Sequence, residues 1–216
     1  MHLRDDASST RDRLIAAAEV LFAERGIDGV SLREVTRRSG ARNAVAIQYH
    51  FADRHGLLAA VLGRHLAGVA AGRHPMMDEF EASNSPSARA LASALVRPLA
   101  AKLGEADGGP EFLQIYADVM SRDAALIGDL DSSMKRWRTL ATGVLEPEAL
   151  LLHRRFTAIL YAAVELGRRA KAGPHQDNAL FTSWLIDVIA AVLAAPVSSE
   201  TRRLLGRRVV EADESV

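Results

Sequence analysis

The stretch GARNAVAIQYHF, residues 40–51, gathers side chains that could bind nucleic acid. Gln48 can hydrogen-bond the edge of an adenine, and Arg42 can reach guanine or phosphate. Tyr49 and His50 can donate to phosphates, contacts that fix register more than sequence. The alternatives are that Gln48 is an ordinary exposed polar residue and that Tyr49 and His50 form a helix end packed against the next helix.

If this stretch forms a helix, its side chains divide into two faces. Ile47 and Phe51 are four residues apart and point the same way, so both can pack on a core. Asn43 lies at the amino end and Val45 faces outward. Val45 or Ala46 can contact a thymine methyl group. A helix with one face for a core and one for a groove explains this mixture of apolar and polar residues.

The segments before this stretch read as two further helices. Residues 10–25 have apolar positions on one face, with Thr10 as the expected N-cap and Gly26 where a left-handed C-cap favours glycine. The sequence SLRE, residues 31–34, is a capping box. It opens a short helix that Gly40 ends. A three-helix unit with short second and third helices is typical of the helix-turn-helix, which offers its last helix to a major groove.

The charge around this unit supports the same interpretation. The whole chain has 27 basic and 27 acidic residues, yet residues 33–54 carry five arginines against Glu34 and Asp53, a local balance of +3. Helix amino ends, such as the one at Ser31, also favour phosphate. The alternative for the arginines is a solvated helix face. The remaining candidate DNA contacts from this region are Ser31, Arg33, Arg37 and Arg54.

The sequence from TRDRL to LLAAVL, residues 10–62, resembles the TetR family of bacterial transcriptional regulators. Four segments follow one another in the family's order: LFAERG at the end of the first helix, the SLREV helix, the glycine turn and the QYHF run. Gly40 and Phe51 are separated by one residue more than is commonest in the family, and Gln48 stands where tyrosine is frequent. The resemblance implies a helix-turn-helix DNA-binding domain at residues 1–55. It also implies a helical effector-binding and dimerisation domain at residues 56–216.

The rest of the chain also has helical periodicity, so we predict an all-α fold. Asp53 is expected to cap a long helix that Pro75 ends. The sequence then predicts two helices between residues 111 and 144, a helix over 147–171, a helix over 177–195 and a tail that is helical only in part.

The family resemblance also implies an effector pocket in the second domain. Phe112, Tyr116 and Met120 lie on one helical stripe, and Tyr116 or Gln114 could supply polar groups. The alternative is plain core packing. The full set of candidate pocket residues is Leu95, Leu99, Phe112, Tyr116, Met120, Met134, Trp137 and Phe156.

The last two long helices are rich in small residues, which allow close helix approach. We expect them to form a four-helix interface between two copies, with packing inside one chain as the alternative. In either case four residues are expected to be buried, namely Leu160, Val164, Trp184 and Val188.

The sequence holds no cysteine, no clear zinc cluster and no catalytic motif, so we expect no cofactor, no metal and no enzyme activity. It has no signal-peptide pattern and no membrane-spanning run, so we expect a cytoplasmic protein without a membrane partner. The favoured function is a homodimeric repressor that an unknown small effector releases from a palindromic double-stranded DNA operator. The alternatives are a helical small-molecule binding or interaction protein with no specific DNA site and, less favoured, a helical enzyme.

Overall fold

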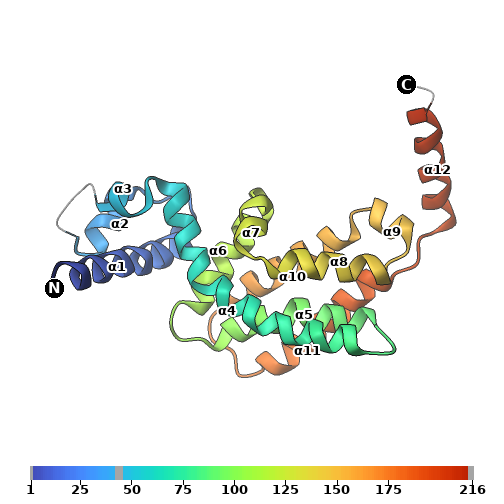
Figure 1. The fold of residues 1–216 in the computed structure, drawn as a ribbon, viewed down its shortest axis with the longest axis horizontal. Coiled ribbons are helices and arrows are strands. Elements are labelled where there is room, and N and C mark those ends of the chain that lie inside the picture. The colour runs from blue at the N-terminus through green and yellow to red at the C-terminus, as the bar shows by residue number, and fades with distance from the viewer. Residues whose placement is uncertain (1, 42–45, 214–216) are drawn as a thin grey trace.

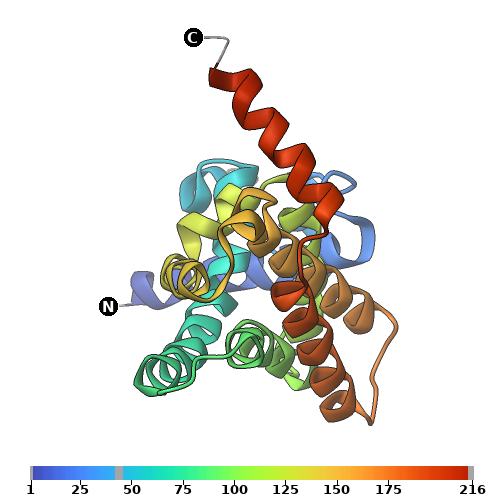
Figure 2. The same ribbon diagram turned by 90° about the vertical axis from the view of Figure 1, so that its right-hand side faces the viewer.

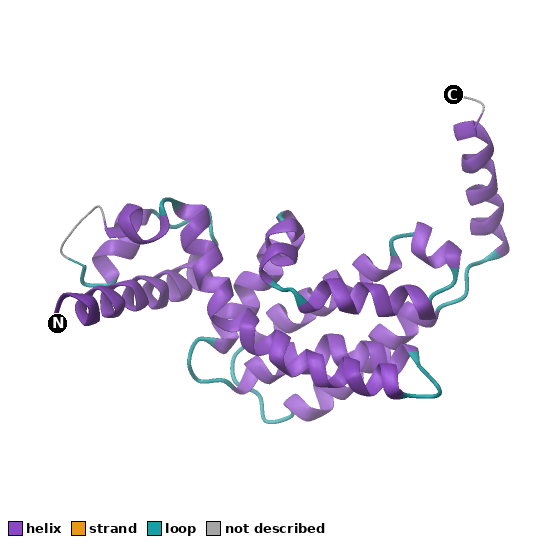
Figure 3. Ribbon diagram, viewed as in Figure 1, coloured by secondary structure: helices purple, strands orange, loops and turns teal. Residues whose placement is uncertain are grey.

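The computed structural model describes residues 2–41 and 46–213, and every regular element in these ranges is a helix (Figure 3). The predicted all-α fold, with an N-terminal helix-turn-helix and a helical C-terminal domain, is confirmed. Three helices form one end of the molecule (Figure 1). They are α1 (His2–Arg25), α2 (Leu32–Arg38) and α3 (Ala46–Phe51).

The predicted helix signals of this end are present, with one correction. Ser31 caps α2 in a complete capping box with Glu34. Gly26 has the left-handed φ of +76° that the end of α1 requires. However, α1 begins at His2 rather than at Thr10, because no proline or glycine interrupts residues 2–25. The Thr10 hydroxyl accepts a hydrogen bond from Arg13 Nη2 at 3.0 Å instead of capping the helix.

A single long helix, α4 (Arg54–Ala82), connects this end to the rest of the molecule (Figure 1). Asp53 caps it as predicted, accepting a hydrogen bond from the Gly56 amide at 2.8 Å. The prediction that Pro75 ends this helix is wrong, since α4 continues for seven more residues. Met77 and Phe80 lie in this last part and are buried, so core packing offsets the backbone hydrogen bond that proline removes.

The C-terminal domain is a bundle in which α6 lies along α10, and α5 lies against both α4 and α11. Its elements are α5 (Ala88–Ala100), the 3₁₀ turn η1 (Ala101–Gly104), α6 (Gly109–Arg122), α7 (Ala124–Leu130), α8 (Ser133–Val144), α9 (Pro147–Leu151), α10 (Arg154–Lys171), α11 (Asn178–Ala194) and α12 (Ser199–Asp213).

The bundle has more breaks than the sequence indicates. Between residues 111 and 144 the chain forms three helices rather than two, because it also breaks before Ser133, where Asp131 turns into the core to meet Arg73. The helix predicted over residues 147–171 is divided at His153, which has a φ of +54°. The tail forms the helix α12, which extends away from the bundle (Figure 2).

The α6–α10 crossing is close because Gly167 has no side chain. A Cβ atom at this position would lie 2.6 Å from the Ala117 Cβ and 3.1 Å from the Leu113 carbonyl oxygen. The two helices therefore act as one packed unit. Among the described helices, no single one is long and apolar enough to cross a membrane. Only α11 and the start of α12 taken together reach that length and apolar composition, and a bend of 50° separates them.

Candidate nucleic-acid interface

The inner face of α3 is fixed to the helix-turn-helix core. Ile47 and Phe51 are buried, as their spacing predicts, and the Arg11 guanidinium lies 5.3 Å from the centre of the Phe51 ring. Ala46 is also buried, so it cannot make the thymine contact considered as an alternative to Val45. The predicted contacts Arg42, Asn43 and Val45 lie outside the residues that the structure describes.

The outer face of α3 presents side chains to solvent. Gln48 is exposed, and Tyr49 is 82% exposed. His50 is half-buried, with its ring centre 4.9 Å from that of Tyr49 in an edge-on arrangement. An aromatic residue that remains so exposed on a short, well-anchored helix is available to a partner.

On α2, Arg33 and Arg37 point to solvent as expected. Arg38 also does, although its Nη2 lies 4.0 Å from the Glu24 carboxylate. The guanidinium groups of α2 and the hydroxyl of Tyr49 thus provide hydrogen-bond donors on two helices, of which α2 packs against α1 and α3 packs against α4. Such a surface can bind phosphates through the arginines and a groove edge through α3.

Two of the predicted DNA contacts have structural partners within the protein. The Ser31 hydroxyl lies 2.8 Å from Glu34 Oε2 and accepts a hydrogen bond from the Glu34 amide. The Ser31 backbone amide also donates to Glu34 Oε2 at 2.8 Å, and this bond, followed by the one from the Ser31 hydroxyl, lowers the pKa of the Glu34 carboxyl. Arg54 donates from Nη1 to the Ile27 carbonyl oxygen at 2.6 Å. Both residues position α2 and α4, whatever further contacts they make.

A tight turn sets the angle between α3 and α4. Ala52 has a φ of +64°, and a Cβ at Gly56 would lie 2.0 Å from the Phe51 carbonyl oxygen. Glycine is therefore required where the first turn of α4 passes the end of α3. The direction in which Tyr49 projects is consequently coupled to the direction of α4.

A buried polar network joins α1 to the C-terminal domain. Glu19 and His65 are almost completely buried, and His65 Nε2 lies 2.6 Å from Glu19 Oε1. Arg64 donates to Glu19 at 2.9 Å and to Asp107 at 2.5 Å, and this guanidinium lowers the pKa of Asp107. His65 Nδ1 lies 3.5 Å from the Glu105 carboxylate. This network was not predicted from the sequence, in which its two central residues are 46 positions apart.

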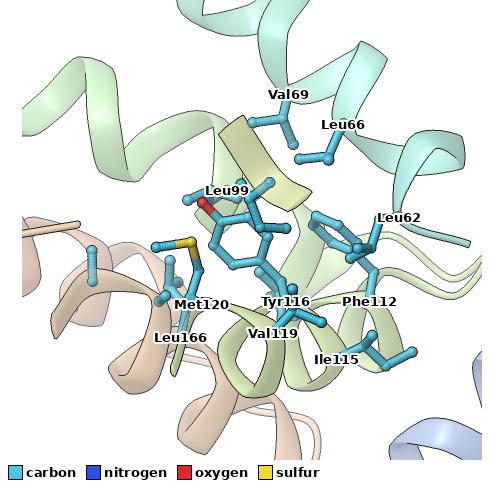
Figure 4. Packing of buried hydrophobic residues seen from close by; sticks show 14 of the residues in the cluster. Leu62, Leu66, Val69, Leu99, Phe112, Ile115, Tyr116, Val119, Met120 and Leu166 are labelled. Carbon is cyan, nitrogen blue, oxygen red and sulfur yellow. The ribbon is translucent and has the colours of Figure 1, made fainter. Parts of the chain in front are cut away.

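Seven of the eight predicted pocket residues are buried in the bundle core, around the stripe of Phe112, Tyr116 and Met120 (Figure 4). The structure does not bring Phe156 to them, because its side chain is 46% exposed on α10. Gln114 is also elsewhere: it lines a surface hollow of about 560 Å³ where α1, α6 and α10 meet. None of the eight residues lines that hollow.

The four residues expected at a dimer interface are not fully buried within the single chain. Leu160, Val164 and Val188 are half-buried, and Trp184 is 44% exposed. Intrachain packing therefore does not cover this face of α10 and α11. Of the His, Asp and Glu side chains in the described ranges, no group of three or more could hold a metal ion.

The amino-terminal region matches known protein sequences. The family model described as bacterial regulatory proteins, tetR family, matches residues 14–61. The HTH-type transcriptional repressor BepR of Brucella suis is 34% identical over 59 residues, which are 27% of this chain and 28% of that protein. The chain thus matches little more than a quarter of the length of this curated relative.

Two crystal structures assigned to TetR-family transcriptional regulators share the fold over most of their length. One, from Mesorhizobium loti, has a TM-score of 0.51 and 15% identity, and the match covers 88% of this chain and 96% of that one. The other, from Rhodococcus, has a TM-score of 0.50 and 22% identity, with 87% and 100% covered.

Proposed function

The chain belongs to the TetR family of bacterial regulatory proteins, and from this premise we propose that it is a homodimeric repressor of transcription. In this proposal the helix-turn-helix binds a palindromic operator, and a small effector in the C-terminal domain releases it. The protein acts in the cytoplasm and catalyses no reaction. The repressor relative supports the direction of control.

The observation that carries the DNA-binding proposal is the exposure of Tyr49 on an otherwise anchored helix. Ile47 and Phe51 hold α3 in place, while Tyr49 and Gln48 face solvent. The Tyr49 side chain is 82% exposed, so a partner can reach its hydroxyl without any change in the fold. Its hydroxyl can donate to a phosphate while Gln48 reaches a base edge.

The dimer proposal rests on the partly uncovered face of α10 and α11. Trp184 is 44% exposed and Leu180 is 69% exposed, so a second copy could bury apolar surface there. A two-fold pair would present two α3 helices to the same side of a duplex. Helix-turn-helix dimers that bind palindromes place their recognition helices about 34–36 Å apart, which is one turn of DNA, or a multiple of that distance.

The decisive experiment is titration of a fluorescent duplex from the intergenic region beside the gene, at about 50 and 200 mM salt. We expect tight binding that resists competitor DNA, weakens steeply with salt and is lost in Tyr49→Ala. Because Tyr49 is exposed, this substitution leaves the fold intact.

Arg37→Ala and Arg97→Ala form a matched pair, since both arginines are exposed but Arg97 lies on α5. Loss of a phosphate contact at Arg37 should reduce the salt slope by about 1, and Arg97→Ala should leave it unchanged. Weak binding that is equal for wild type and Tyr49→Ala, on this duplex and on fragments selected from the genome, would reject the proposal. It would favour a small-molecule binding protein without a specific DNA site.

A further inference from the structure

The centre of the C-terminal domain contains a charged cluster with no access to solvent. The Arg73 side chain on α4 and the Asp131 side chain before α8 are both 0% exposed, and Arg73 Nη1 donates to Asp131 Oδ2 at 2.6 Å. Nη1 also donates to the Ser133 hydroxyl at 2.5 Å, and Nε lies 3.3 Å from the Ala94 carbonyl oxygen. This cluster joins α4, α5 and the α7–α8 turn.

Two donors of this region have no partner among the described residues, namely Arg73 Nη2 and the Tyr116 hydroxyl. Tyr116 is 1% exposed, and Arg73 follows Val69, a neighbour of Tyr116 in the core (Figure 4), by one turn of α4, so α4 directs both residues toward the same part of the core. Burial raises the pKa of Tyr116 to about 12, so the hydroxyl keeps its proton and remains a donor. A buried donor without an acceptor is costly, and native proteins retain few of them.

The surroundings of the Tyr116 hydroxyl are apolar. Leu99 and Met120 lie beside the ring, and Leu66 and Val69 of α4 lie on the side toward Phe112 (Figure 4). Met120 is unbranched and flexible, so it can move to admit a small molecule. An occupant of this position would meet apolar side chains on most sides and the two donors on one.

We propose that Arg73 Nη2 and the Tyr116 hydroxyl anchor the effector of the proposed repressor, and that this effector is a small, uncharged, largely apolar molecule with a hydrogen-bond acceptor. Ketones, lactones and phenols are of this class. The choice of an uncharged molecule follows from the ion pair. Asp131 already neutralises Arg73, so a carboxylate would bring an unpaired charge into the core.

The position of Tyr116 also suggests how its occupancy reaches the DNA-binding end. The Tyr116 ring centre is 5.6 Å from that of Phe112, which stacks on His65 at 4.8 Å. His65 is in turn 2.6 Å from Glu19 of α1. A molecule held by the Tyr116 hydroxyl therefore acts on a continuous row of packed groups that reaches α1 of the helix-turn-helix.

The first test concerns the free protein and the variant Tyr116→Phe, with Tyr161→Phe on α10 as the control. If the Tyr116 hydroxyl is kept without a partner, its removal leaves the urea midpoint unchanged or raises it. A midpoint lowered by more than that of the control would show that the hydroxyl already has a partner, such as a buried water, and would overturn the proposal.

The second test compares three probes that share a ring, by ligand-observed NMR on the full chain without DNA: acetophenone, benzoate and toluene. Acetophenone should bind most tightly, and Tyr116→Phe should weaken it about three- to tenfold, as expected for one hydrogen bond. Toluene should bind equally to both proteins. Preference for benzoate, equal binding of acetophenone to both proteins, or no binding up to the solubility limit would each refute the assignment.

This inference rests on the proposed function, but the two can fail separately. If acetophenone binding depends on Tyr116 but the protein does not bind operator DNA, the proposed site is supported and the proposed repressor function is rejected. If the protein binds operator DNA but none of the probes, the proposed repressor function is supported and the proposed site is rejected.

Discussion

Removing the carboxylate of Asp131 should be among the most damaging single changes in the C-terminal domain. In Asp131→Ala the Arg73 guanidinium would remain buried without a counter-charge, because both side chains are 0% exposed. The loss of one partner of a fully buried ion pair costs about 3–5 kcal/mol. Since small proteins are stable by only about 5–15 kcal/mol, this is a large fraction of the total.

The measurements are urea and thermal denaturation followed by circular dichroism, at one fixed protein concentration because a dimer would dissociate on unfolding. For a chain of this size, 3–5 kcal/mol corresponds to a fall in Tm of roughly 6–20 °C. Asp129→Ala is the matched control, since Asp129 is exposed on α7, and it should change stability by no more than about 0.5 kcal/mol.

A double variant separates the ion pair from general damage. Arg73→Met in the Asp131→Ala background removes the unpaired charge and should recover much of the lost stability, as apolar replacements of buried pairs often do. Two results would refute the reasoning. One is a loss of less than about 1 kcal/mol in Asp131→Ala. The other is a double variant whose loss of stability equals the sum of the losses in the two single variants, because additive losses would mean that the two charges are not coupled.

Three further predictions concern other parts of the molecule. Gly108→Ala should destabilise the protein by about 1–3 kcal/mol in a urea titration. Gly108 has a φ of +78°, and a Cβ there would lie 2.1 Å from the carboxylate of Glu19, which is held in place. The control Gly104→Ala has open space around the new Cβ and should cost much less. Glu34 has a lowered folded pKa, so its contribution to stability is present above the unfolded value near 4.5 and is lost as the pH falls through the lower folded value. The Tm difference between wild type and Glu34→Gln, measured from pH 7 to pH 3, should therefore vanish only at the acid end, and a constant difference would contradict this. Trp184→Glu should convert a dimer to a monomer in light scattering at micromolar concentration, with helicity unchanged; a wild type that is already monomeric would contradict the interface.

Local signals explain why the helix-turn-helix could be predicted from sequence. The capping box at Ser31, the glycine after α1 and the i, i+4 pair of Ile47 and Phe51 depend on residues within a few positions of one another. Pro75 shows the limit of such signals. A proline predicts a helix end, but burial of the residues beyond it keeps α4 continuous.

The polar groups that matter in the core could not be found in this way. Arg73 and Asp131 are 58 positions apart, and neither belongs to a recognisable motif. The same holds for Glu19 and His65, which the sequence shows only as a charged residue and a scattered histidine. Tyr116 was selected as one residue of an apolar stripe, but nothing in its spacing indicates that its hydroxyl has no partner.

The continuity of α4 gives it the mechanics of a lever. From Asp53 at the α3 turn to Arg73 in the bundle, the helix runs about 30 Å. A tilt of about 5° around Arg73 would thus move the α3 end by about 2.6 Å, and in the proposed dimer the two α3 helices would change their separation by about 5 Å. That is about a seventh of the 34–36 Å repeat of the duplex. A displacement in the bundle no larger than one side chain would therefore suffice to move the two α3 helices out of register with the major groove.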